Sequence, residues 1–161
     1  MTPQQQADFI AGLVPGAQAA QAQYNVFASV TIAQAIFESS WWQSRLTHEA
    51  NNYFGIKSSE GWSGDTVSKV TTEDYPNGQQ YTVTAAFRKY PDAAASILDH
   101  AGFLDNYGNP VRYAAALACT DGPSQAMAIA EAGYSSNPLY GKMLCNEIRA
   151  RNLTQYDNPS T

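Results

Sequence analysis

One glutamate, Glu38, ends an apolar stretch and is followed at once by two serines and two tryptophans. Nearly every position before it is apolar, which predicts a central buried helix over residues 30–40. A carboxylate at the C-terminal end of such a helix meets the negative end of the helix dipole and is desolvated by its aromatic neighbours. Both effects raise the pKa of Glu38 toward the value that a general acid needs near neutral pH. A glutamate that only points into solvent is the competing interpretation.

Glycoside hydrolysis is one chemistry that commonly pairs such an acid with a second carboxylate. Glu73 and Asp74 are the candidates, because β-forming residues surround them and Pro76-Asn77-Gly78 predicts the turn of a hairpin. Neighbouring strand residues face opposite sides, so at most one of the two can point at Glu38. Strand alternation alone does not choose between them.

Two loops combine polar and aromatic residues. The first, residues 51–57, contains Asn52 and Phe54, and the second, residues 133–138, contains Tyr134 and is followed by Tyr140. Amide side chains and tyrosine hydroxyls can bond to sugar hydroxyls and acetamido groups. Ordinary turns have the same composition, so neither loop is specific by itself.

The elements that must position these residues form an α+β chain. The 161 residues suffice for one domain, expected over residues 1–161 with a core of about 26–156. Thr2 is expected to cap a helix that Pro15 interrupts before a second run to about residue 24, and Ser29 to cap the buried helix. Further helices are expected over about 93–107 (capped by Asp92), 112–118, 123–132 and 139–150.

Composition excludes several classes of function. The net charge of -5 argues against binding to nucleic acid or to an anionic membrane. The sequence contains no apolar run of about 18 residues and no signal peptide at its start. We therefore expect delivery by a route other than general secretion. Cys119 and Cys145 are either two unpaired thiols or one disulfide, which would imply an oxidising compartment. They and the two histidines lack the spacing of a metal site.

Four segments, taken in order, resemble glycoside hydrolase family 73, the β-N-acetylglucosaminidases that cleave peptidoglycan. They are residues 28–41, 52–57, 72–90 and 132–140. The resemblance implies a lysozyme-like α+β domain with a cleft between the helical core and the hairpin. It also implies that Glu38 is the general acid, that the β-1,4 bond on the reducing side of N-acetylglucosamine is cut, and that no metal or cofactor takes part.

The resemblance assigns further roles. Without gaps, Asp74 matches the family's second carboxylate, whereas Glu73 would need a one-residue bulge. Tyr134 would orient the substrate's acetamido group or the reacting carboxylate. The mechanism within the family is either inverting or assisted by the substrate's own acetamido oxygen. The remaining residues expected to bind substrate are Trp41, Trp42, Asn52, Phe54 and Tyr140. The chain departs from the family where Ser40 and Trp42 replace glycines and Asn137 replaces an aspartate.

Two rival functions remain open at this stage. One is an N-acetylmuramidase or lytic transglycosylase on the same fold, and the other is a non-catalytic glycan-binding module. An antibacterial effector and a phage lysin, each acting in the periplasm of a target cell, both fit the context. A disulfide would favour the effector, whose expected partner is an immunity protein that plugs the cleft.

Overall fold

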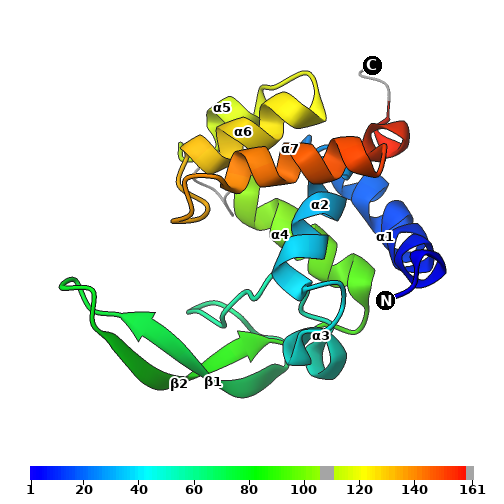
Figure 1. Ribbon diagram of the computed structural model, residues 1–161. Helices are drawn as coiled ribbons and strands as arrows, with labels where there is room; N and C mark the ends of the chain where they lie inside the picture. The colour runs from blue at the N-terminus through cyan, green and yellow to red at the C-terminus, as the bar shows by residue number, and fades with distance from the viewer. Residues whose placement is uncertain (106–110, 159–161) are drawn as a thin grey trace.

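The computed structural model describes residues 1–105 and 111–158, with the side chains of Glu73 and Asp74 outside the described part. Figure 1 shows the helices packed into one lobe, from which a two-stranded hairpin projects. This arrangement confirms the predicted α+β class. The elements follow the order α1 (Pro3–Tyr24), α2 (Ala28–Ser39), α3 (Arg45–Ala50), β1 (Thr66–Asp74), β2 (Gln80–Arg88), α4 (Ala93–Asp105), α5 (Ala114–Leu117), α6 (Gly122–Glu131), α7 (Tyr140–Ala150) and the 3-10 helix η1 (Leu153–Tyr156).

Helix α1 is continuous, whereas the sequence predicts an interruption at Pro15. The expected cap is present, because Gln5 N donates to Thr2 Oγ1 at 3.2 Å and Thr2 N donates to Gln5 Oε1 at 2.8 Å. A proline inside a helix removes a hydrogen bond and normally kinks or breaks the helix. Here Gly16 allows α1 to lie close to α4, since a Cβ at Gly16 would come within 3.2 Å of Ala94 Cα. We attribute the continuity of α1 to this packing.

Helix α2 is the buried centre of the helical lobe, as predicted. All its residues from Ala28 to Ile36 are buried, which explains why the helix is apolar on nearly every side. The expected cap at Ser29 is wrong, because the helix begins at Ala28, two residues before the expected start at residue 30, and Ser29 lies inside it. Asp157 instead accepts hydrogen bonds from Ser29 N at 2.7 Å and Ser29 Oγ at 2.8 Å. A carboxylate from the end of the chain thus satisfies the first turn of α2.

The two strands of the hairpin pair in antiparallel orientation, and each residue of β1 lies opposite a single residue of β2. The register runs from Thr66 opposite Arg88 to Asp74 opposite Gln80. The bulge considered for Glu73 is therefore not formed between these paired strands. Gly78, with a φ of 81°, occupies the turn that the Asn-Gly pair predicts.

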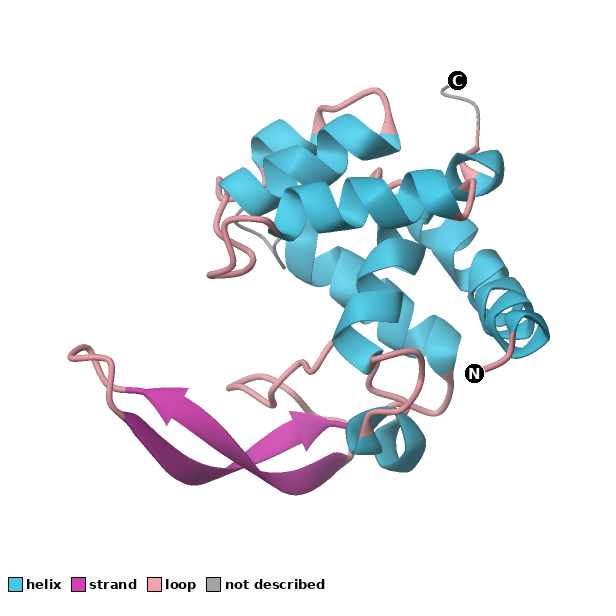
Figure 2. Ribbon diagram, viewed as in Figure 1, coloured by secondary structure: helices cyan, strands magenta, loops and turns pink. Residues whose placement is uncertain are grey.

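One end of the hairpin is fixed and the other projects outward. At the fixed end, Ser58 N donates to Ala86 O at 2.8 Å and Arg88 N donates to Ile56 O at 3.0 Å, so the preceding loop pairs with β2. Figure 2 shows the turn as the part of the hairpin farthest from the lobe. The backbone of residues 73–74 consequently lies near the outer end of the hairpin.

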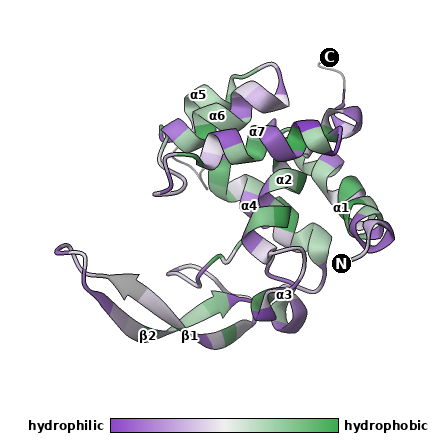
Figure 3. Ribbon diagram, viewed as in Figure 1, coloured by the Kyte–Doolittle hydropathy of each residue, from purple (hydrophilic) through white to green (hydrophobic). Residues whose placement is uncertain are grey.

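The other helices agree with expectation in part. Helix α4 starts after Asp92, whose carboxylate accepts a hydrogen bond from Ala95 N at 2.8 Å, as predicted. Its expected continuation to residue 107 falls outside the described residues. Helix α5 is shorter than the predicted 112–118, and the short elements α3 and η1 were not predicted. Figure 3 shows hydrophobic segments gathered in the helical lobe, where the core lies.

Candidate active site

Glu38 lies on the last turn of α2 and lines a pocket of about 550 Å³. Glu38 is an exposed residue by its accessible surface, yet the surrounding protein removes enough water from its carboxyl group to raise its pKa. This confirms the direction of the shift predicted for Glu38. The other described residues of the pocket are Phe54, Gly55, Ile56, Lys57, Ser59, Arg88, His100, Phe103, Arg112, Tyr113 and Tyr134.

Tyr140 holds the carboxylate of Glu38. The Tyr140 hydroxyl donates to Glu38 Oε1 at 2.8 Å, and Gln34 Nε2 donates to Tyr140 Oη at 3.2 Å. Because the amide of Gln34 already donates to the phenol oxygen, the phenol hydrogen is directed at Glu38. This bond lowers the pKa of Glu38 and so opposes the larger effect of burial. Tyr140 itself is buried, so the structure places it behind the carboxylate and not in the expected cleft wall.

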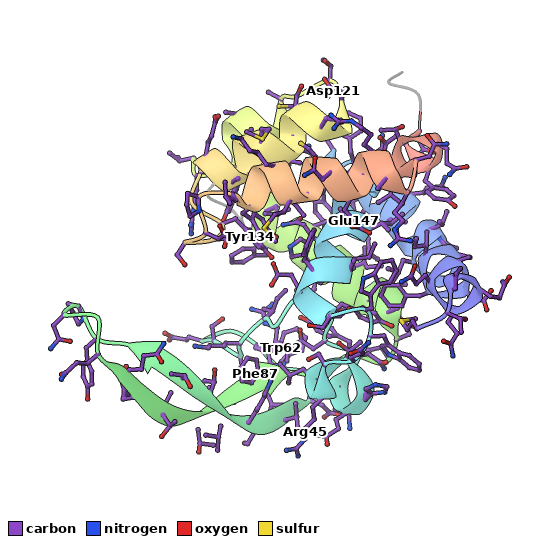
Figure 4. The ribbon with its side chains drawn as sticks, in the orientation of Figure 1. Arg45, Trp62, Phe87, Asp121, Tyr134 and Glu147 are labelled. Atoms are coloured by element: carbon purple, nitrogen blue, oxygen red, sulfur yellow. The ribbon has the colours of Figure 1, made fainter. Side chains whose placement is uncertain are left out.

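Tyr134 lies in the same pocket as Glu38, as the sequence predicts, and its hydroxyl contacts a histidine. Tyr134 Oη is 3.0 Å from His100 Nε2, and the Tyr134 ring stacks on Tyr140 with centroids 5.6 Å apart. Burial, with a contribution from the charge of Glu38, raises the pKa of Tyr134 well above its usual range. Tyr134 therefore remains a protonated phenol, whereas the contact with the carboxylate belongs to Tyr140. Figure 4 shows Tyr134 on the side of the helical lobe that faces the hairpin.

His100 is a site residue that the sequence reasoning missed. It is fully buried, stacks on Phe54 with centroids 3.8 Å apart, and contacts Tyr134. Burial lowers the pKa of His100 to about 3, so the ring is uncharged near neutral pH. The available signal was a histidine on the buried face of α4, beside Ile97 and Leu104.

Asn52 shapes the loop beside the pocket and is not among the residues that line it. Its Nδ2 donates to Ile56 O and to Arg88 O, both at 2.9 Å, while Ile56 N donates to Asn52 Oδ1 at 3.0 Å. Only 1% of Asn52 is exposed. The structure thus gives Asn52 a structural role, and its binding of substrate stays a prediction, whereas Phe54 lines the pocket.

Trp41 and Trp42 line a second pocket of about 540 Å³, together with Phe9 and His48. The structure therefore does not bring these tryptophans into the pocket of Glu38, where the sequence places them. The chain turns away after α2 because Ser40, Trp41 and Trp42 adopt φ values of 50°, 57° and 63°. This left-handed backbone gives a physical reason for the family's glycines at positions 40 and 42.

Three further predictions from the sequence concern the second carboxylate, the cysteines and a metal site. The backbone of Glu73 and Asp74 is paired with β2, and the choice of second carboxylate stays a prediction because their side chains are outside the described part. Cys119 and Cys145 are free thiols, so the disulfide alternative is wrong. Among residues 1–105 and 111–158, no group of three or more His, Cys, Asp or Glu side chains is arranged to hold a metal ion.

A carboxyl group with a raised pKa, at the end of a buried helix and in a pocket near a β-hairpin, is the arrangement of lysozyme-like glycosidases. The chain belongs to the glucosaminidase family, described as mannosyl-glycoprotein endo-β-N-acetylglucosaminidase, whose sequence model matches residues 14–153.

Relatives of known name agree with this family. The peptidoglycan hydrolase FlgJ of Escherichia coli strain K12 is 37% identical over 145 residues, which cover 88% of this chain and 45% of that protein. The exo-glucosaminidase LytG of Bacillus subtilis strain 168 is 34% identical over 160 residues, which cover 97% of this chain and 56% of that protein. The chain thus spans about half the length of these two relatives.

A solved structure has the same fold over nearly the whole chain. The catalytic domain of the autolysin Auto from Listeria monocytogenes superposes with a TM-score of 0.87 and 32% sequence identity. The match covers 98% of this chain and 90% of that domain.

Proposed function

We propose that this chain is a peptidoglycan hydrolase that cleaves the β-1,4 bond between N-acetylglucosamine and N-acetylmuramic acid, with Glu38 as the general acid. The observation that carries the proposal is the protonatable carboxyl of Glu38, which the pocket desolvates and Tyr140 holds in place. The family membership and the names of the relatives FlgJ and LytG support the substrate and the bond.

The hydrogen bonds around Glu38 suggest which oxygen carries the proton. Oε1 accepts the Tyr140 hydroxyl, so Oε2 is the oxygen that holds the acidic proton and delivers it to the glycosidic oxygen. Once the proton has left, the bond from Tyr140 is made to a full carboxylate and becomes stronger. Tyr140 therefore stabilises the product of the proton transfer more than the starting state.

The remaining roles belong to the same proposal. Asp74, or alternatively Glu73, would stabilise positive charge on the sugar or activate water, and the Tyr134 hydroxyl would orient the acetamido group. The backbone of residues 73–74 lies near the outer end of the hairpin, which fits an inverting or a substrate-assisted mechanism better than a covalent one. A covalent mechanism needs two carboxyls only about 5–5.5 Å apart.

The test is mass spectrometry of fragments released from purified cell-wall sacculi by the wild-type protein and by Glu38→Gln, Asp74→Asn and Glu73→Gln. We expect products with N-acetylglucosamine at the reducing end, and no products from Glu38→Gln. Reducing-end N-acetylmuramic acid or its anhydro form would instead identify a muramidase or a lytic transglycosylase. Equal release by wild type and Glu38→Gln would refute the assignment of the acid. Negligible release by both would indicate a glycan-binding module.

The place of action follows from the proposed substrate. We propose that the chain acts on the cell wall, outside the cytoplasmic membrane. In the described part of the chain, no helix is both long and apolar enough to cross a membrane. The free thiols of Cys119 and Cys145 remove the one sequence feature that favoured an effector over a phage lysin. A neighbouring reading frame for a signal-peptide-bearing inhibitor that abolishes lysis would identify an effector with its immunity protein, and a holin would identify a lysin.

A further inference from the structure

The described lining of the Glu38 pocket contains more cationic than anionic side chains, although the protein as a whole is acidic. The chain has 14 acidic and nine basic residues. The described lining of the pocket nevertheless contains three cationic side chains, Lys57, Arg88 and Arg112, and one carboxylate, Glu38. A pocket with this lining favours an anionic ligand over a neutral one.

The two arginines of the lining are not equivalent. Arg88 is buried and forms an ion pair with Asp99, with Nη1 2.8 Å from Oδ2, so its charge is balanced inside the protein. Arg112 is exposed to solvent. Among the residues that the structure describes, no carboxylate lies within ion-pair distance of Arg112.

Arg112 is nevertheless held in a fixed position. Its Nε donates to Ala132 O at 3.0 Å and its Nη2 donates to Gly133 O, while the guanidinium lies 5.0 Å from the centre of the Tyr113 ring. These anchors place the positive charge next to Tyr134, the residue that follows Gly133. A guanidinium has five N–H donors, and the two carbonyls use two of them. An arginine fixed in this way loses little side-chain entropy when it binds a carboxylate.

We propose that Arg112 binds a carboxylate of the peptide that is attached to the muramyl sugar, and so selects peptide-bearing strands over neutral N-acetyl glycans. The inference rests on the proposed function and adds a specificity residue to it. A glycan of N-acetylglucosamine alone carries no carboxylate, whereas the peptide of peptidoglycan does. The remaining N–H donors of Arg112 match a carboxylate in both charge and geometry.

The test compares two soluble substrates with the same glycan. Both are uncross-linked peptide-bearing strands with their amines acetylated, and in one of them the carboxylates are also converted to neutral methylamides. For the wild-type protein we expect kcat/KM to be about tenfold higher on the anionic strands, as for one charge-assisted hydrogen bond at a solvent-exposed position. Arg112→Gln should cleave both substrates at the rate that wild type shows on the neutral one. Arg112→Lys should keep part of the preference.

The matched control is Arg45→Gln. It also removes one positive charge, but Arg45 pairs with Glu49 on α3 and does not line the pocket, so the wild-type preference should be retained. Equal losses on both substrates in Arg112→Gln, or no preference in wild type, would overturn the inference. Thermal unfolding would identify a misfolded Arg112→Gln variant, and in that case the Arg112→Lys variant decides. If Arg112→Lys kept the full wild-type preference for anionic strands, or lost kcat/KM equally on both substrates, the inference would be overturned. A wild-type protein that cleaves neither substrate would overturn the proposed function and this inference with it.

Discussion

Replacing Tyr140 by phenylalanine removes the hydrogen bond to Glu38 while it keeps the buried ring. The lost bond is 2.8 Å long and runs from the phenol to Glu38 Oε1. Because the hydroxyl stabilises the ionised form of Glu38, its loss leaves burial unopposed and raises the pKa of Glu38 further. The protein should therefore keep its acid protonated at higher pH.

The size of the shift follows from the strength of the bond. A hydrogen bond to a charged group contributes about 1.5–3 kcal/mol, and one pKa unit corresponds to about 1.4 kcal/mol. Glu38 keeps contact with solvent, and water can replace part of what is lost, so the lower end applies. We expect the pKa of Glu38 to rise by about one unit.

The assay is the pH dependence of kcat/KM, whose alkaline limb reports the ionisation of the free enzyme's acid. In Tyr140→Phe this limb should move about one unit toward higher pH. Gln34→Leu, which removes the donor to Tyr140 Oη, should move it in the same direction by less. Tyr134→Phe is the matched control, because the Tyr134 hydroxyl contacts His100 and not Glu38. A limb that stays in place or moves toward acid in Tyr140→Phe would refute the reasoning.

Three further changes test other parts of the structure. Glu38→Gln should raise the melting temperature at pH 7. The folded wild-type protein binds the Glu38 proton more tightly than the unfolded chain does, so its stability falls as the pH rises from 4.5 through the raised pKa. Calorimetry should therefore show the gain disappear below pH 4.5. Ser40→Gly should stabilise the protein by about 0.5–1 kcal/mol in urea unfolding, because glycine adopts the φ of 50° without steric cost, and a loss of stability would contradict the left-handed turn. Asp157→Ala should lower the free energy of unfolding by about 1–2 kcal/mol in the same assay, because α2 loses the hydrogen bonds from Ser29 to Asp157. Asp157→Asn keeps an acceptor and should cost less. Equal stability of Asp157→Ala and wild type would exclude the cap.

Much of the local structure follows from short-range patterns. The buried helix that ends near Glu38, the Asn-Gly turn and the caps at Thr2 and Asp92 are visible in the sequence because each depends on a few neighbouring residues. The same reasoning failed at Pro15 and at Ser29. At Pro15 the helix stays continuous, which we attribute to its close packing against α4, and at Ser29 the cap comes from Asp157, 128 residues away.

The sequence by itself determined that Glu38 ends a buried helix, because a helix that is apolar on nearly every side is a buried one. It predicted a raised pKa for Glu38 but left open a carboxylate that points into solvent, and the desolvation that raises this pKa comes from the tertiary structure. Only the tertiary structure decided which groups surround the carboxyl. Tyr140 reaches Glu38 across 102 residues because α7 packs against α2, and His100 meets Tyr134 across 34. Trp41 and Trp42, only three and four residues after Glu38 in sequence, line another pocket because three left-handed residues turn the chain away. Periodicity predicts which face of an element is buried, whereas the partner across that face depends on how distant elements pack.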